Sequence, residues 1–127
     1  MQLHQGRCHC EHTRFEVEAD IDQVRECDCS VCRRRGALSF RVEPDAIRFL
    51  TPLSELSVYR WGTGTGADYF CATCGIMPYR QPSALTPAEL DAGAVPFRGW
   101  TINVRCIDDL EIDVLPRVRI RGSKLVI

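Results

Sequence analysis

The sequence has no apolar run that approaches the roughly 18 residues of a membrane-spanning helix. Its first residues, MQLHQGRCHCEH, contain no apolar stretch of the kind found in a secretory signal. A basic excess, which nucleic-acid-binding domains usually carry, is also missing, because the formal net charge is −1. We therefore expect a cytoplasmic protein without a membrane segment, and nucleic-acid binding is not expected.

Internal repeats and linker-like segments are absent from the 127 residues. The composition, 45% hydrophobic and 26% charged, is that of a globular protein. A chain of this length can bury roughly two thirds of the surface that it exposes when unfolded. We expect residues 1–127 to form a single domain.

Cysteine is the one residue type present in excess. An even number of cysteines suggests disulfides in a secreted chain, but in the reducing cytoplasm such clusters are more often metal ligands. Neighbours two or three residues apart are also poorly placed for relaxed disulfides, so we favour metal binding. The eight cysteines are Cys8, Cys10, Cys27, Cys29, Cys32, Cys71, Cys74 and Cys106.

Several short segments alternate hydrophobic and polar residues, a pattern that indicates β-strands. In residues 13–19, for example, Phe15, Val17 and Ala19 share one face. Frequent turn signals separate these segments, which favours an antiparallel sheet. The sequence thus predicts a mainly β, small antiparallel strand-rich domain, with strands near 13–19, 38–42, 47–50, 56–61, 67–71, 76–80 and 110–114.

Signals for helix are few. In TPAEL at 86–90, Thr86 is a candidate N-cap, Pro87 stands at the first helical position and Glu89 completes a capping box. A second short turn is expected over 30–35. We expect one or two short helical turns and no long helix.

Two cysteine pairs can supply the four ligands of a closed site. In an extended segment, residues two apart point to the same side, so Cys8 and Cys10 can bind one ion. Cys71 and Cys74 belong to a tight turn of the Cys-x-x-Cys type. Four thiolates are the complement of a closed tetrahedral zinc site. Spacing leaves a second partition open, in which 27–29 rather than 8–10 joins 71–74.

The run CDCSVC at 27–32 holds three further sulfurs. Three protein ligands with one open position are typical of a catalytic zinc. We therefore predict Cys27, Cys29 and Cys32 as catalytic and metal-binding residues. Arg33 and Arg34 follow directly and are predicted to neutralise the site or to bind a substrate carboxylate. A solvated turn is the alternative for the arginines, and a redox-sensing thiol site is the alternative for the cysteines.

Four other residues could join a metal site. The alternation in residues 102–106 places Cys106 in the core as a small hydrophobe, with a free thiol or a fourth ligand as alternatives. His4, His9 and His12 flank the first cysteine pair and could ligate, but we expect them at the surface.

The order of these motifs resembles the family of glutathione-dependent formaldehyde-activating enzymes and centromere protein V. The segments that carry the resemblance are GRCHCEHTRFEV, ECDCSVCRRRG, YFCATCGIMPY and GWTINVRCIDD, within about residues 6–116. Where that family commonly has glycine after the first Cys-x-Cys, this chain has Glu11. The resemblance implies a zinc-bound β-tent fold with two zinc sites, one structural at Cys8, Cys10, Cys71 and Cys74, and one with an open position at Cys27, Cys29 and Cys32.

The same resemblance implies an activity. It is that of a carbon–sulfur lyase, similar to S-hydroxymethylglutathione synthase, which joins glutathione or a related small thiol to formaldehyde or a related aldehyde. The alternative is a non-catalytic zinc module that binds a protein or nucleic-acid partner. Arg117, Arg119 and Arg121 could serve that module, although their alternation with Val118 and Ile120 predicts one exposed strand face. The sequence leaves the oligomeric state open.

Overall fold

The structure is a computed structural model that describes residues 1–124. Within these residues the chain forms ten short strands and two short α-helices, so the predicted mainly β class is confirmed. The helices are α1 (Ser30–Arg35) and α2 (Pro87–Asp91). The strands are β1 (Gln2–Arg7), β2 (Arg14–Ala19), β3 (Val24–Cys27), β4 (Ser39–Val42), β5 (Ile47–Phe49), β6 (Ser57–Tyr59), β7 (Ala67–Phe70), β8 (Tyr79–Gln81), β9 (Trp100–Asn103) and β10 (Arg117–Ile120).

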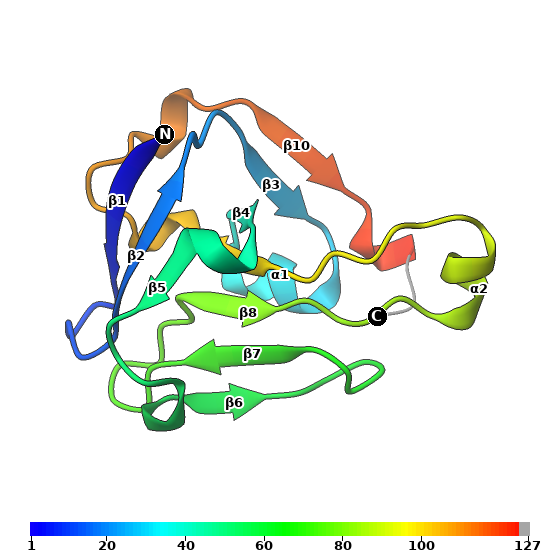
Figure 1. The fold of residues 1–127 in the computed structure, drawn as a ribbon, viewed down its shortest axis with the longest axis horizontal. Helices are drawn as coiled ribbons and strands as arrows, with labels where there is room; N and C mark the ends of the chain where they lie inside the picture. The colour runs from blue at the N-terminus through cyan, green and yellow to red at the C-terminus, as the bar shows by residue number, and fades with distance from the viewer. Residues whose placement is uncertain (125–127) are drawn as a thin grey trace.

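The strands form two sheets. A three-stranded sheet has the order β1-β2-β5, and a seven-stranded sheet has the order β10-β3-β4-β9-β8-β7-β6. In Figure 1 the small sheet lies on the left, β3 and β10 slope across the upper right, and β6 to β8 run along the bottom. The strand pairs are antiparallel, as expected, except β3 with β10, which are parallel. The long connection between these two strands permits parallel pairing, which a tight hairpin cannot produce.

Aromatic side chains pack the two sheets together. Phe15 and Tyr79 are fully buried, and their ring centroids lie 5.3 Å apart in an edge-to-face arrangement. Phe49 of β5 contacts Trp100 of β9 with centroids 4.8 Å apart. Each of these pairs joins the small sheet to the large one. Such contacts add to the stabilisation from apolar burial and fix how the sheets face each other.

Both predicted helical turns are present. Thr86 caps α2 by accepting a hydrogen bond from the Glu89 amide, and the Glu89 side chain accepts from the Thr86 amide in return. Helix α1 covers the range expected for it. No helix in residues 1–124 is both long and apolar enough to cross a bilayer.

The predicted strand at 110–114 is wrong. Residues Ile112–Val114 form a 3-10 turn, closed by a hydrogen bond of 3.1 Å from the Leu115 amide to the Ile112 carbonyl. The hydrophobic alternation of this segment corresponds to burial in part: Leu110 and Ile112 pack against the core, whereas Val114 is exposed. The described chain places no strand beside this segment, so its backbone bonds within itself.

Candidate metal centres

Four sulfurs from two distant turns converge at one place. The turn after β1 supplies Cys8 and Cys10, and the turn between β7 and β8 supplies Cys71 and Cys74. All four Sγ atoms lie within 4.8 Å of one another. Cys10 Sγ is 3.6 Å from both Cys8 Sγ and Cys71 Sγ. The structure therefore realises the first of the two partitions that the spacing left open.

This geometry fits a zinc ion. A Zn–S bond of about 2.3 Å and tetrahedral angles separate two bound sulfurs by about 3.8 Å. Backbone amides also point at the sulfurs, from Thr13 to Cys8 Sγ at 3.3 Å and from Cys74 to Cys71 Sγ at 3.5 Å. Burial opposes ionisation of Cys71, yet hydrogen bonds from the amides of Cys74 and Thr73 lower the pKa of its thiol to about 6. Cys71 is thus prepared to present a thiolate to a metal ion.

Two backbone features shape the turns that carry these sulfurs. The amide of Gly75 donates to the Cys71 carbonyl at 2.9 Å, and Gly75 has a φ of +80°. Glu11 occupies the matching position in the first turn, with a φ of +68°, and its amide donates to the Cys8 carbonyl at 3.3 Å. Glycine adopts this conformation freely, whereas an L side chain is strained there by about 1–2 kcal/mol.

The strain at Glu11 leads to a stability prediction. Glu11→Gly and Glu11→Ala both remove the exposed ion pair that Glu11 forms with Arg14 at 2.6 Å, so the two variants differ mainly in backbone freedom. We expect Glu11→Gly to be more stable than Glu11→Ala by about 1 kcal/mol. Thermal unfolding of both proteins, each with its metal content measured, tests this. Equal stabilities would show that the turn relaxes to a negative φ.

The other three sulfurs form a second cluster. Cys27 ends β3, Cys29 is the N-cap residue of α1, and Cys32 lies inside the helix. Their Sγ atoms are also within 4.8 Å of one another. Within residues 1–124, no fourth cysteine, histidine or acidic side chain joins the group. The amides of Cys29 and Cys32 donate to Cys27 Sγ and Cys29 Sγ, both at 3.4 Å.

The C-terminal segment packs against this second cluster. The Asp28 amide donates to the Ile120 carbonyl, and the Ser123 amide donates to Asp28 Oδ1, both at 3.0 Å. Gly122 is buried, and a Cβ atom added to it would clash with Cys27 Sγ and lie 2.9 Å from Cys29 Cβ. Glycine is required there for space, because only glycine lets the backbone approach the sulfurs so closely.

A single methyl group at Gly122 is therefore expected to damage the second cluster. In Gly122→Ala either the sulfurs or the C-terminal segment must move, and we expect loss of the metal ion from this cluster with the four-cysteine site retained. Metal analysis of the purified variant measures this. Ser123→Ala is the control variant, because it keeps the backbone amide that donates to Asp28 Oδ1 and adds no atom near the sulfurs. Full metal content in Gly122→Ala would show that the backbone at residue 122 does not need to approach the sulfurs so closely.

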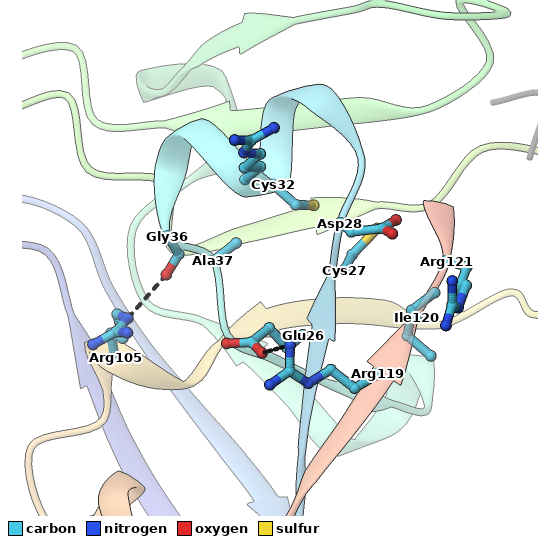
Figure 2. A pocket seen from close by; sticks show the side chains of 11 residues that line it. Glu26, Cys27, Asp28, Cys32, Gly36, Ala37, Arg105, Arg119, Ile120 and Arg121 are labelled. Atoms are coloured by element: carbon cyan, nitrogen blue, oxygen red, sulfur yellow. Dashed lines mark hydrogen bonds and ion pairs between the residues drawn. The ribbon is translucent and has the colours of Figure 1, made fainter. Parts of the chain in front are cut away.

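A cavity of about 690 Å³ opens beside the three-cysteine cluster (Figure 2). Cys27 and Cys32 are in its wall, and β10, which pairs with β3, brings Arg119 and Ile120 beside Cys27, with Arg121 following directly. Its charged lining is mainly basic, because Arg33 and Arg105 line it too and only Glu26 and Asp28 are acidic. The cavity is thus suited to a small ligand with net negative charge.

The three arginines of the CRRR run have different surroundings. Arg33 lines the cavity. Arg34 bonds back to Ser30 of its own helix, with 3.0 Å to the hydroxyl. Arg35 forms an ion pair of 2.6 Å with the buried Asp68.

Asp68 organises a polar network that the sequence analysis missed. Arg80 Nε and Trp61 Nε1 donate to its carboxylate at 2.6 and 2.8 Å, in addition to Arg35. Burial raises the pKa of Asp68, but these donors outweigh burial and lower it below the usual range. A charged residue inside the otherwise apolar segment 67–71 was the available signal, because a buried carboxylate needs partners.

The remaining candidates lie outside both clusters. Cys106 is buried in the core as expected, and burial raises the pKa of its thiol to about 12. His9 and His12 are exposed, as predicted. His4 is buried rather than at the surface, because β1 alternates and places it on the inner face, where Nδ1 is 3.2 Å from Asp109 Oδ1.

Arg117 and Arg119 are exposed on β10, as the alternation predicted, and both pair with Glu26 at 3.1 Å.

Comparison with known proteins relates this chain to a described family and to a solved structure. A sequence model of the family described as glutathione-dependent formaldehyde-activating enzyme matches residues 3–95. A crystal structure of a protein from Rhodobacter sphaeroides superposes with a TM-score of 0.69. It is 28% identical in sequence, and the match covers 90% of this chain and 99% of that one. The matched span 3–95 contains all seven clustered cysteines but neither Cys106 nor Gly122.

Proposed function

The chain belongs to the glutathione-dependent formaldehyde-activating enzyme family, and on that premise we propose that its three-cysteine cluster is a zinc site where glutathione or a related small thiol binds and adds to formaldehyde. A carbon–sulfur bond forms in this reaction. The thiol proton is transferred to the aldehyde oxygen, so the product is S-hydroxymethylglutathione and no oxidant or reductant is consumed. The reverse reaction is that of a carbon–sulfur lyase.

One observation carries this proposal. Cys27, Cys29 and Cys32 bring three sulfurs within 4.8 Å of one another without a fourth ligand from residues 1–124, and the group faces a cavity of about 690 Å³. Three thiolates leave one position of a tetrahedral ion for an exchangeable group. The volume of this cavity is in the range found for sites that bind small organic ligands. A tripeptide thiol such as glutathione is of suitable size.

The chain's own residues would position the thiol. Backbone amides hold Cys27 and Cys29 Sγ in place, and Gly122 closes one side of the cluster. Zinc, when bound, would favour the thiolate form of the substrate, which is scarce for a free thiol with a pKa of about 8.5. Arg33 is in the cavity wall and is our candidate for a carboxylate contact. Arg34 could contribute only by leaving Ser30.

Calorimetry tests the proposed binding. We expect glutathione to bind the two-zinc protein with a stoichiometry of one per chain, and S-methylglutathione, which offers no thiolate, to bind more weakly. Turnover is measured as product formation from glutathione and formaldehyde above the uncatalysed rate. Absence of heat at millimolar glutathione would refute the binding, and heat without rate enhancement would leave a thiol carrier rather than an enzyme.

A further inference from the structure

A second, smaller cavity also borders the three cysteines. Its volume is about 130 Å³, and Cys27, Cys29 and Cys32 are in its wall together with residues of β3, β4, β8 and β9. Arg25 of β3 pairs with Ser39 of β4. Arg41 lies two residues further along β4 and pairs with Thr101 of β9.

Four arginines line this cavity, and no acidic side chain does: Arg25, Arg35, Arg41 and Arg80. Arg35 and Arg80 share the single carboxylate of Asp68. Arg25 and Arg41 form no ion pair within residues 1–124. The Arg41 guanidinium lies over the ring of Phe97, 4.9 Å from its centroid. One carboxylate cannot offset four guanidinium groups, so the wall of this cavity keeps an excess of positive charge.

The charges of Arg25 and Arg41 are held under unfavourable conditions. Burial and the positive charges of Arg25 and Arg80 lower the pKa of Arg41. Arg25 is itself only partly exposed. Placing like charges together and removing them from water costs free energy unless an anion compensates them. A carboxylate bound by two guanidinium groups would satisfy both through short charge-assisted hydrogen bonds.

We propose that Arg25 and Arg41 form a carboxylate subsite for the thiol that binds at the three-cysteine cluster, so that the preferred ligands are thiols carrying a carboxylate. This inference rests on the proposed function. It adds residues from β3 and β4 that the CRRR run does not contain, and it assigns the ligand a class, an anionic thiol, rather than a particular molecule.

The test compares ligands with and without carboxylates. Glutathione, its diethyl ester and S-methylglutathione are titrated into two-zinc wild-type, Arg25→Gln and Arg41→Gln protein, with binding followed by heat and by fluorescence of Trp61, which lines the same cavity. We expect each substitution to weaken glutathione and S-methylglutathione about 10- to 100-fold, as for loss of a hydrogen bond to a charged group. The diester should bind wild type and variants alike, and Arg→Lys at either position should restore part of the affinity.

Arg48→Gln, on the other sheet with an exposed ion pair to Glu16, is the matched charge control and should leave affinity unchanged. Circular dichroism and metal content confirm that each variant is folded. Wild-type affinity for glutathione in both variants would overturn the subsite while leaving the proposed function intact. If S-methylglutathione binding depends on these arginines but wild type binds glutathione no more tightly than S-methylglutathione, the subsite is supported and the thiol site is refuted. Failure of wild type to bind either ligand would overturn both.

Discussion

Cys71→Ser is expected to yield a protein that does not fold. Cys71 is almost fully buried, and its sulfur meets Cys10 at 3.6 Å in the four-cysteine cluster. Zinc in a structural site contributes roughly 10–16 kcal/mol, which is comparable to the roughly 5–15 kcal/mol by which a typical domain is stable. Removing one of four thiolates forfeits most of this contribution.

The position of the cluster makes the effect global. The turn that holds Cys8 and Cys10 connects strands of the small sheet, and the turn that holds Cys71 and Cys74 connects strands of the large sheet. A metal ion bound by all four would join the sheets at a point where the sequence separation is about 60 residues, and loop closure over that distance is otherwise unfavourable.

Circular dichroism and elemental analysis of purified Cys71→Ser measure the outcome, and treatment of wild type with a strong zinc chelator should reproduce it. Cys106→Ala is the matched control, because Cys106 is equally buried and belongs to neither cluster. That variant should lose only about 1 kcal/mol, as for other small truncations in a core. A folded Cys71→Ser protein with two metal ions would show that the four-cysteine cluster is not the structural site.

Cys29→Ser is expected to have the opposite profile, with the fold kept and the ligand site lost. The three sulfurs of this cluster come from residues 27–32, so an ion bound there joins only the end of β3 to α1. Metal content should fall from two ions to one per chain. Glutathione affinity should fall to the detection limit of calorimetry, because the thiol no longer has an ion to bind.

Thermal unfolding, elemental analysis and titration with glutathione are compared between Cys29→Ser and the same Cys106→Ala control. Retention of two ions in Cys29→Ser would show that Cys29 is not a ligand. Unfolding like that of Cys71→Ser would show that the second cluster is also structural. If one ion is lost and glutathione affinity stays normal, the thiol must bind at a site other than this cluster.

Local patterns accounted for much of the fold. The alternation in 13–19 predicted β2 with Phe15 and Val17 inside, and the capping box predicted α2. These two predictions succeed because the alternation of side chains along a strand and the capping of a helix end each depend on only a few neighbouring residues. The same rule failed at 110–114, because alternate burial is also compatible with a 3-10 turn when no partner strand lies beside the segment.

The sequence by itself determined the inventory of sulfurs and their grouping into short motifs, because the reach of a thiolate within a turn depends only on spacing. The tertiary structure decided which motifs come together, since Cys8 and Cys71 meet only when the two sheets pack. It also decided that Gly122 closes on Cys27 and that Arg25 and Arg41 lie beside the cysteines. Those relations depend on strand order and register in the seven-stranded sheet, and no local pattern encodes which strands become neighbours.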